Sequence, residues 1–219
     1  MPSSAELRVG GLARLSTCDW PGQLAATVFC QGCPWDCSYC HNPHLLPVMG
    51  EAAWPWAQVL AFLERRRGLL DAVVFSGGEP TLQTALPQAI ATVRAMGFRI
   101  GLHTGGAYPR RLAGVLPLLD WVGFDVKAPF EDYQRITGVV GSGDRALQSL
   151  RHLLGIGVAY QLRTTVHPAL LSADDLANLA AQLGSLGVKD HTIQPFRELG
   201  SRLDRIRPHF TEQPSLTRQ

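Results

Sequence analysis

The sequence predicts an α/β fold in which six parallel strands form a partial (βα)6 barrel. Short apolar runs alternate about six times with segments of helical periodicity along the 219 residues. Such alternation is typical of a parallel sheet with right-handed helical crossovers. Polar motifs follow four of the runs directly, and parallel sheets bind ligands at the carboxyl ends of their strands. Six units are fewer than the eight of a closed barrel, so we expect an open one.

The expected strands are short apolar runs with β-branched or aromatic residues. In chain order they are Ala25–Cys30, Ala72–Ser76, Arg99–His103, Trp121–Asp125, Tyr160–Val166 and Asp190–Pro195. The expected helices have apolar residues at helical spacing, and glycine closes several of them, as in Arg67-Gly68, Met96-Gly97 and Leu154-Gly155. These helices are Ala57–Arg67, Leu82–Met96, Ala146–Leu154 and Ala173–Leu183.

Length and composition favour one domain with a single core. Hydrophobic residues make up 46% of the chain, and the formal net charge is only +2, without the basic stripe that nucleic-acid binding needs. We expect a domain over residues 1–200 and a polar, partly ordered tail over 201–219. No run reaches the roughly 18 apolar residues of a membrane span, and no signal peptide is recognisable. We therefore expect a cytoplasmic protein with no membrane or nucleic-acid partner.

Three cysteines lie close together in the loop after the first expected strand. Cys33, Cys37 and Cys40 have the spacing C-x3-C-x2-C, which can bring three thiolates to one metal centre. On a four-iron cluster they would leave one iron free to bind a substrate. Thiolates also select zinc, with His41 as a fourth ligand, so a non-catalytic zinc-binding interaction module stays open here. The two other cysteines are too few for a second four-cysteine cluster.

Three other strand ends carry glycine-rich or charged motifs. Gly77-Gly78-Glu79-Pro80 follows the second expected strand, His103-Thr104-Gly105-Gly106 the third, and Asp125-Val126-Lys127 the fourth. Glycine lets the backbone approach a ligand without a Cβ in the way. Taken alone, the Gly-Gly pair could be an ordinary turn, and the aspartate and lysine could form a mutual surface ion pair.

Together these motifs are similar to those of the radical S-adenosylmethionine (SAM) superfamily, and within it to the glycyl-radical-enzyme activases. The likeness is greatest to activating proteins of anaerobic ribonucleoside-triphosphate reductase. With the motifs above it extends to about Gly200. The matching opening stretches are Gly11-Leu12, Asp19-Trp20-Pro21-Gly22, Val28-Phe29, Gln31-Gly32-Cys33 and Tyr39-Cys40-His41-Asn42-Pro43.

The resemblance implies a partial (βα)6 radical SAM barrel and a role for each motif. The three cysteines would ligate a single [4Fe–4S] cluster and form the catalytic centre, with the open iron holding the methionine moiety of SAM. Tyr39 would lie against the adenine, Glu79 would accept from the ammonium, and Arg163 would meet the carboxylate or ribose. The alternative for Tyr39 is ordinary packing in the loop, and that for Arg163 is a polar residue inside a partial barrel without a ligand role. The implied SAM-binding residues are Tyr39, Gly77, Gly78, Glu79, Thr104, Asp125, Lys127 and Arg163.

The activity that the resemblance implies is that of a radical SAM oxidoreductase. An electron from a flavodoxin-like donor would cleave SAM at the cluster into methionine and a 5′-deoxyadenosyl radical. That radical would take a hydrogen atom from a glycine of a partner, a glycyl-radical enzyme such as anaerobic ribonucleotide reductase. A radical SAM enzyme that acts on a small molecule or another peptide would share every cofactor residue and is the alternative.

Two positions depart from the activase pattern. Activases of the pyruvate formate-lyase type commonly have Asp-Thr-Asn-Gly where this chain has His103-Thr104-Gly105-Gly106. Hard cations prefer oxygen ligands, so the pattern does not predict a cation beside SAM at His103. Arg197 stands where relatives often have histidine, and its guanidinium could stack on the adenine.

Overall fold

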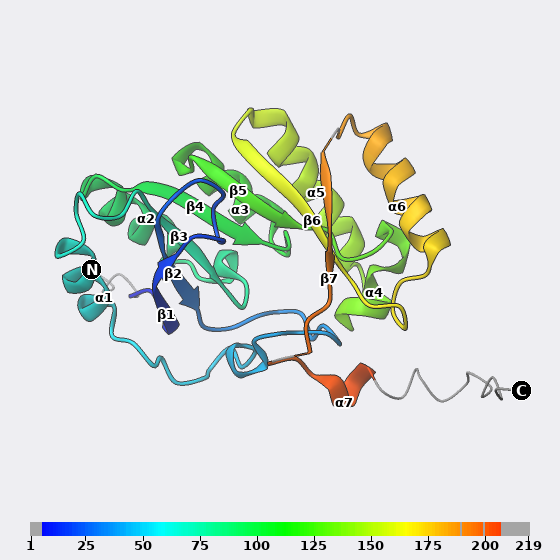
Figure 1. The fold of residues 1–219 in the computed structure, drawn as a ribbon, viewed down its shortest axis with the longest axis horizontal. Helices are drawn as coiled ribbons and strands as arrows, with labels where there is room; N and C mark the ends of the chain where they lie inside the picture. Colours follow the sequence, from blue (N-terminus) through cyan, green and yellow to red (C-terminus); the bar gives the residue numbers. More distant parts are fainter. Residues whose placement is uncertain (1–5, 189, 199, 207–219) are drawn as a thin grey trace, which may run out of the picture.

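The computed structural model describes residues 6–188, 190–198 and 200–206. Its centre is one sheet with the strands in sequence order (Figure 1). Strands β2 to β7 are parallel to one another, and β1 is added at the edge by antiparallel pairing with β2. The strands are β1 (Val9–Ser16), β2 (Ala25–Cys30), β3 (Ala72–Gly77), β4 (Arg99–Thr104), β5 (Trp121–Asp125), β6 (Ala159–Val166) and β7 (His191–Pro195).

Helices α1 to α6 lie in the connections between the parallel strands, and α7 follows β7. The longest are the amphipathic helices that follow β5 and β6, and shorter 3₁₀ turns lie at several strand ends. The helices are α1 (Trp56–Glu64), α2 (Leu86–Ala95), α3 (Pro109–Val115), α4 (Tyr133–Thr137), α5 (Ser142–Ile156), α6 (Ala173–Ser185) and α7 (Leu203–Ile206).

The strand order identifies the sheet as a partial barrel. A doubly wound sheet reverses its strand order, whereas here each parallel strand lies beside the next one in sequence. Right-handed crossovers then place the helices on the same, outer face of the sheet. Among the described residues β1 and β7 are not paired with each other, so the sheet is not closed. The predicted α/β partial barrel is confirmed.

Alternating side chains give the sheet two different faces. Outward-facing strand residues pack against the helices in the main core. This core includes Val28, Val73, Phe75, Ile100, Leu102, Val122, Phe124 and Leu162 from strands, with Val59, Leu63, Ile90, Val93, Leu112, Leu150, Leu153, Leu179 and Leu183 from helices. On the inner face Trp20 stacks on Trp121 with ring centroids 5.5 Å apart, in a small cluster with Ala25, Ala72 and Val74.

Several elements differ from the prediction. The antiparallel strand β1 was not predicted, because its sequence VGGLARLS contains two glycines and alternates weakly. Helices α3 and α4 were also missed, since seven and five residues show little periodicity. Leu154-Gly155 does not end a helix: α5 continues to Ile156 and ends at Gly157, whose φ is 79°. The expected helix from Leu82 begins at Leu86, after a 3₁₀ turn.

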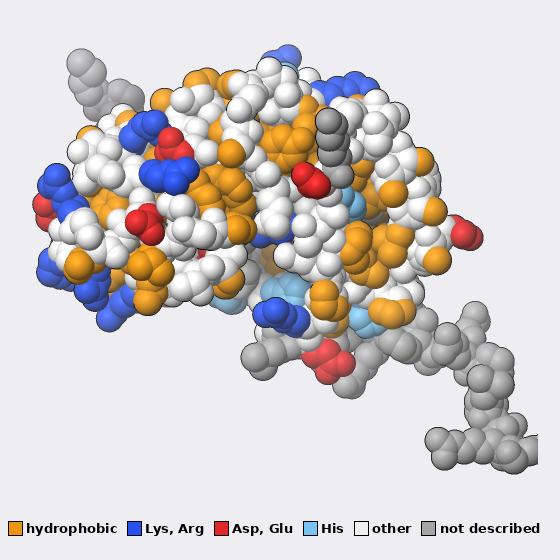
Figure 2. All heavy atoms as spheres, turned by 45° about the horizontal axis from the view of Figure 1, so that its top comes forward, with side chains coloured by type: hydrophobic (Ala, Val, Ile, Leu, Met, Phe, Trp, Pro, Cys, Tyr) orange, Lys and Arg blue, Asp and Glu red, His pale blue; other side chains and the backbone are white. Residues whose placement is uncertain are grey.

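The surface shows dispersed charge and dispersed apolar residues. On the face in Figure 2, the Lys and Arg side chains of the described residues form separate groups among uncharged ones. Exposed large apolar side chains, such as Leu15, Met49 and Val140, belong to distant parts of the chain. None of the helices in the described ranges is both long and apolar enough to cross a membrane.

The described chain extends past residue 200, where the sequence suggested a domain boundary. Residues 201–206 include α7, which lies beside the loop that follows β2 (Figure 1). Residues 1–5 and 207–219, which include most of the expected tail, lie outside the described residues. The boundary and the partly ordered tail stay predictions.

Candidate active site at the carboxyl ends of the strands

The motifs at the strand ends meet at one cavity of about 180 Å³. Its walls come from the cysteine loop and from the carboxyl ends of β3, β4, β5 and β6. Neither Arg163 nor Arg197, which could stack on the adenine, lines it. The predicted site residues in its wall are Cys33, Cys37, Cys40, Tyr39, Gly77, Gly78, Glu79, Thr104, Asp125 and Lys127.

The cysteine loop, residues 33–40, is held in place by its backbone. The N–H of Cys33 donates to the carbonyl of Leu46 over 3.1 Å. The N–H groups of Asp36 and Ser38 donate to carbonyls at the end of α4, over 2.9 and 3.1 Å. These hydrogen bonds anchor the loop both near β2 and against α4, so the three thiols are presented from a fixed backbone.

Gly77 and Gly78 allow close contact between two chain segments. Gly77 has a φ of 119°, and a Cβ there would collide with the backbone of Cys30. A Cβ on Gly78 would collide with the carbonyl of Gly32. The two segments are also hydrogen-bonded, since Glu79 N donates to Gly32 O over 2.9 Å. The glycines therefore make room for the end of β2 and for Gly32, which leads into the cysteine loop. The sequence analysis expected only that they would let the backbone approach a ligand.

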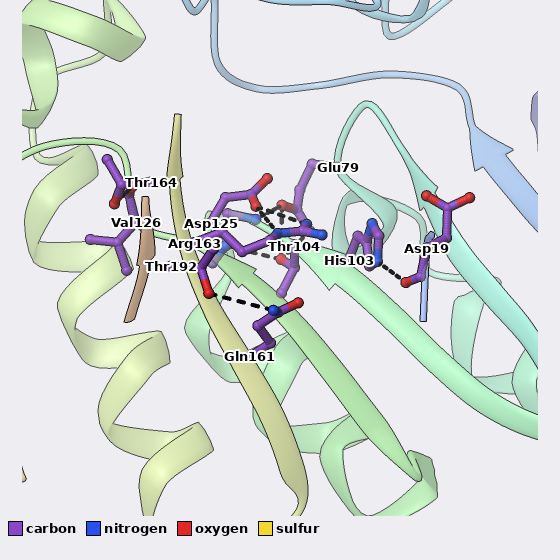
Figure 3. A network of polar contacts seen from close by, with 12 residues as sticks. Asp19, Glu79, His103, Thr104, Asp125, Val126, Gln161, Arg163, Thr164 and Thr192 are labelled. Carbon is purple, nitrogen blue, oxygen red and sulfur yellow. Dashed lines mark hydrogen bonds and ion pairs between the residues drawn. The ribbon is translucent and has the colours of Figure 1, made fainter. Parts of the chain in front are cut away.

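Glu79 is buried and is oriented by neighbouring donors (Figure 3). Its Oε1 accepts from the N–H and the hydroxyl of Thr81, over 3.1 and 2.5 Å. The hydroxyl of Thr104 lies 2.8 and 2.9 Å from the two carboxylate oxygens, and Gly105 N donates to Oε2 over 3.0 Å. Burial raises the pKa of Glu79, although these donors lower it in part. A cation placed beside this carboxylate would therefore favour its charged form.

Asp125 pairs with Arg163, not with Lys127. Arg163 on β6 is the register partner of Asp125 on β5, and its Nε and a terminal nitrogen donate to Oδ1 of Asp125 over 3.0 and 2.9 Å (Figure 3). Burial raises the pKa of Asp125, but the Arg163 and Lys127 charges outweigh burial and lower it. Asp125 is therefore ionised in the cavity wall, and Arg163 supports it from the inner face of the sheet.

Lys127 lies over two aromatic rings of the cysteine loop. Its Nζ is 5.6 Å from the ring centroid of Tyr39 and 5.9 Å from that of Trp35, within the range of cation–π attraction. Burial lowers the pKa of Lys127, but the surrounding acidic groups raise it well above its usual value. The cavity therefore contains a permanent ammonium charge beside the cysteine loop.

Trp35 is a cavity residue that the sequence reasoning did not single out. Its side chain is buried, and a Cβ on Gly105 would come within 2.5 Å of its ring, so glycine is needed there. Among the described residues the buried Nε1 of Trp35 and Oγ of Ser38 have no hydrogen-bond partner. The sequence signal that could have identified Trp35 as a cavity residue is its position as an aromatic residue inside a cysteine-rich loop.

His103 faces the cavity as a neutral imidazole. Its Nε2–H donates to the Asp19 carbonyl over 2.6 Å (Figure 3). Its ring contacts Trp121 with centroids 5.5 Å apart. Burial, followed by the Arg163 charge, lowers the pKa of His103 to about 4. The ring therefore fills the inner face of the sheet and carries no charge near neutral pH.

Replacing His103 with glutamine should make stability less sensitive to acid between about pH 6.5 and pH 4. The folded-state pKa of about 4 lies below the ordinary value of 6.5, so in this window the unfolded chain binds a proton that the folded chain does not. The contribution of this group to stability is therefore complete above pH 6.5 and falls by up to about 3 kcal/mol as the pH drops through 4. Urea unfolding across this range measures the effect.

The control for this prediction is glutamine in place of His152, an exposed histidine on α5. That variant should keep the acid sensitivity of the wild type. An identical pH dependence in the wild type and the His103→Gln variant would contradict the prediction.

A family model of the radical SAM superfamily matches residues 27–181 of the chain. The match begins in β2, includes the cysteine loop and the glycine-rich strand ends, and ends in α6. The chain belongs to the radical SAM superfamily. Enzymes of this superfamily use a [4Fe–4S] cluster together with SAM, so these are the cofactors of this radical SAM protein.

Known relatives agree with this assignment, and a solved structure has a similar fold. A protein of Methanocaldococcus jannaschii named as a glycyl-radical enzyme activating enzyme is 28% identical over 192 residues, which cover 78% of this chain and 73% of the relative. The pyruvate formate-lyase-activating enzyme of Clostridium pasteurianum is 29% identical over 88% of this chain and 83% of its own. The fold is similar to that of Streptococcus suis SuiB bound to SAM, with a TM-score of 0.60 and 13% identity. This likeness covers 83% of the radical SAM chain but only 45% of SuiB.

The cysteine loop has the donor chemistry of a radical SAM cluster site. Burial raises the pKa of Cys33 to about 12 and that of Cys37 to about 11, while the Lys127 charge lowers both. Bound iron must therefore displace the thiol protons. Three thiols on one cavity wall suit an iron–sulfur cluster. In the described ranges, however, no three Cys, His, Asp or Glu side chains are gathered closely enough to hold a metal ion as they stand.

His41, the fourth ligand of the zinc alternative, lines the cavity but bonds to the segment that follows β7. Its Nε2–H donates to the carbonyl of Arg197 over 2.9 Å, and its ring contacts Phe196 with centroids 5.3 Å apart. The superfamily match identifies an enzyme, so the non-catalytic zinc module is set aside. The side chain of Arg197 is exposed, and stacking of its guanidinium on adenine stays a prediction.

Proposed function

We propose that this radical SAM enzyme activates a glycyl-radical enzyme by removing a hydrogen atom from a glycine of that partner. The observation that carries the proposal is the cavity at the strand ends, where three thiols of one loop face Glu79, Asp125 and Lys127 from three neighbouring strand ends. Similarity to activating enzymes over most of the chain supports the choice of reaction.

In this proposal Cys33, Cys37 and Cys40 hold the [4Fe–4S] cluster. When bound, the cluster supplies the electron that cleaves SAM into methionine and a 5′-deoxyadenosyl radical. The chain's own task is to present three thiols from a fixed loop, and they lose their protons when iron binds. The Lys127 ammonium assists because it lowers the pKa values of the Cys33 and Cys37 thiols.

The polar side chains of the cavity would bind and orient SAM. Glu79 would accept from the ammonium of the methionine moiety, and the Thr104 hydroxyl orients the Glu79 carboxylate. Tyr39 supplies an aromatic surface for the adenine. Asp125 would accept from a ligand hydroxyl or ammonium, and Arg163 holds Asp125 in place instead of binding SAM directly.

Gly77 and Gly78 would contribute through the backbone, since they let the β3 end lie against the cysteine loop beside the bound SAM. The partner glycine would enter at the mouth of the open barrel, where β7 is an exposed end strand. We propose anaerobic ribonucleotide reductase as the partner, a flavodoxin-like protein as the electron donor and the cytoplasm as the location.

Radical transfer to a partner tests the proposal. Anaerobically reconstituted enzyme is mixed with SAM, reduced flavodoxin and either anaerobic ribonucleotide reductase or pyruvate formate-lyase, and the electron paramagnetic resonance (EPR) spectrum is recorded. We expect a glycyl-radical doublet with the reductase, and none when its radical glycine is replaced by alanine. A doublet only with pyruvate formate-lyase would reassign the partner. Formation of 5′-deoxyadenosine without a glycyl radical in either protein would favour a small-molecule or peptide substrate.

A further inference from the structure

The segment after β7 contacts the middle of the cysteine loop. We name its described residues, 196–198 and 200–206, the carboxy-terminal strap. Asp36, between the first two cysteines of the loop, forms ion pairs with Arg202 and Arg205 of the strap. One terminal nitrogen of Arg205 lies 2.6 Å from Oδ2 of Asp36, and Arg202 binds Oδ1. Two guanidinium groups thus share one carboxylate of the loop.

A second contact lies directly after the third cysteine. His41 donates to the carbonyl of Arg197 and packs against the ring of Phe196. A Cβ on Gly200 would lie only 3.2 Å from the carbonyl oxygen of His41, so the backbones are close there as well. Figure 1 shows the blue chain after β2 beside the orange end of β7 and α7. The strap therefore follows the loop from Asp36 to His41.

The opposite side of the loop is bound to α4. The N–H of Asp36 donates to the Thr137 carbonyl over 2.9 Å while its carboxylate faces the strap. Of the two arginines, Arg202 is the more enclosed, with 15% of its side chain exposed against 47% for Arg205. A guanidinium so enclosed needs a charged partner, because burying an unpaired charge is costly. Asp36 is the acidic residue that supplies it.

We propose that Asp36 is a positioning residue for the cluster-binding loop, and that the strap fixes Cys33 and Cys37 on the cavity wall through it. This inference rests on the proposed cluster-binding role of the cysteines. Asp36 itself does not line the cavity, so it acts through the loop that it anchors. The geometry of the cluster site then depends on a segment beyond the barrel, encoded about 165 residues after the cysteines.

Amide hydrogen exchange of the metal-free, full-length protein tests the anchoring step. In the Asp36→Ala variant and in the Arg202→Ala, Arg205→Ala double variant, residues 33–40 should exchange about threefold to tenfold faster than in the wild type. This range corresponds to the loss of two partly exposed ion pairs. Asp36→Glu should restore most of the protection. The matched control is Arg94→Ala, which removes the Arg94–Asp120 pair remote from the loop and should leave this segment unchanged.

The EPR spectrum of the reduced, reconstituted cluster with and without SAM tests the consequence for the site. We expect the Asp36→Ala variant to give a broadened or shifted signal with SAM, and Asp36→Glu to give the wild-type signal. Unchanged loop exchange, an equal change in Arg94→Ala, or a wild-type spectrum in Asp36→Ala would overturn the proposal. The exchange measurement needs no cluster, so failure of the wild type to bind iron would count against the proposed function separately.

Discussion

Replacing Cys37 with alanine should abolish the formation of 5′-deoxyadenosine from SAM. Cys37 is 7% exposed and lies in the wall of the cavity between the other two thiols in sequence. Alanine cannot ligate iron, so the loop would offer two thiolates where three are needed to hold the cluster. We expect iron and sulfide content to fall sharply, and product to fall to the level without enzyme. Anaerobic reconstitution with SAM and dithionite, followed by chromatography of the nucleoside product, measures both.

The control for this variant is alanine in place of Cys18. This thiol is exposed in the loop after β1, 3.5 Å from the Ser16 hydroxyl, and does not line the cavity. Its removal should leave iron content and product formation unchanged. Wild-type product from the Cys37→Ala protein would contradict its assignment as a ligand. Zinc in place of iron in the wild-type protein would contradict the cluster itself.

The parallel strands could be predicted because their signals are local. Strands β2 and β5 have the predicted bounds, and the other parallel strands differ from the prediction by only one residue at an end. Strands β2 to β5 are short apolar runs, bounded by glycine or polar residues and packed against helices on their outer face. Strand β6 is only partly buried and β7 is largely exposed, so their apolar signal is weaker. The sequential order of the parallel strands follows from the alternation with helices, since each right-handed crossover carries the chain to the next position.

The elements that were missed lack such local signals. Strand β1 is an edge strand with both faces partly exposed. Its composition has weak strand propensity, so its extended structure depends on its pairing with β2. Helix α4 has five residues, and it is held by contacts with α5 and the cysteine loop. Propensity over so few residues is weak, so tertiary contacts determine their structure.

The candidate site was predictable as a set of residues but not as a set of contacts. Residue type and position at strand ends were enough to place the cysteines and Glu79 in one wall. The ion pair between Asp125 and Arg163 could not be predicted in this way, because the two residues are 38 positions apart and only the register of the sheet brings them together. The contact between Asp36 and Arg202, 166 residues apart, depends similarly on the path of the chain.

The Gly77→Ala variant should show the largest loss of stability among single substitutions at the strand ends. Alanine at a φ of 119° is strained, and its Cβ would collide with the backbone of Cys30, which cannot move aside as a flexible side chain could. Backbone strain and steric overlap together should cost at least about 3 kcal/mol. Urea unfolding of the metal-free protein at neutral pH measures the change without interference from the cofactors.

Gly97→Ala isolates the contribution of the backbone conformation. Gly97 follows α2 with a φ of 96°, and a Cβ there would meet no atom within 4 Å. Its substitution should therefore cost only the conformational strain, about 1 kcal/mol. The difference between the two variants measures the steric overlap of the β3 end with the backbone at the end of β2. Equal losses would show that the end of β2 shifts freely to admit a side chain at Gly77, and would contradict the prediction.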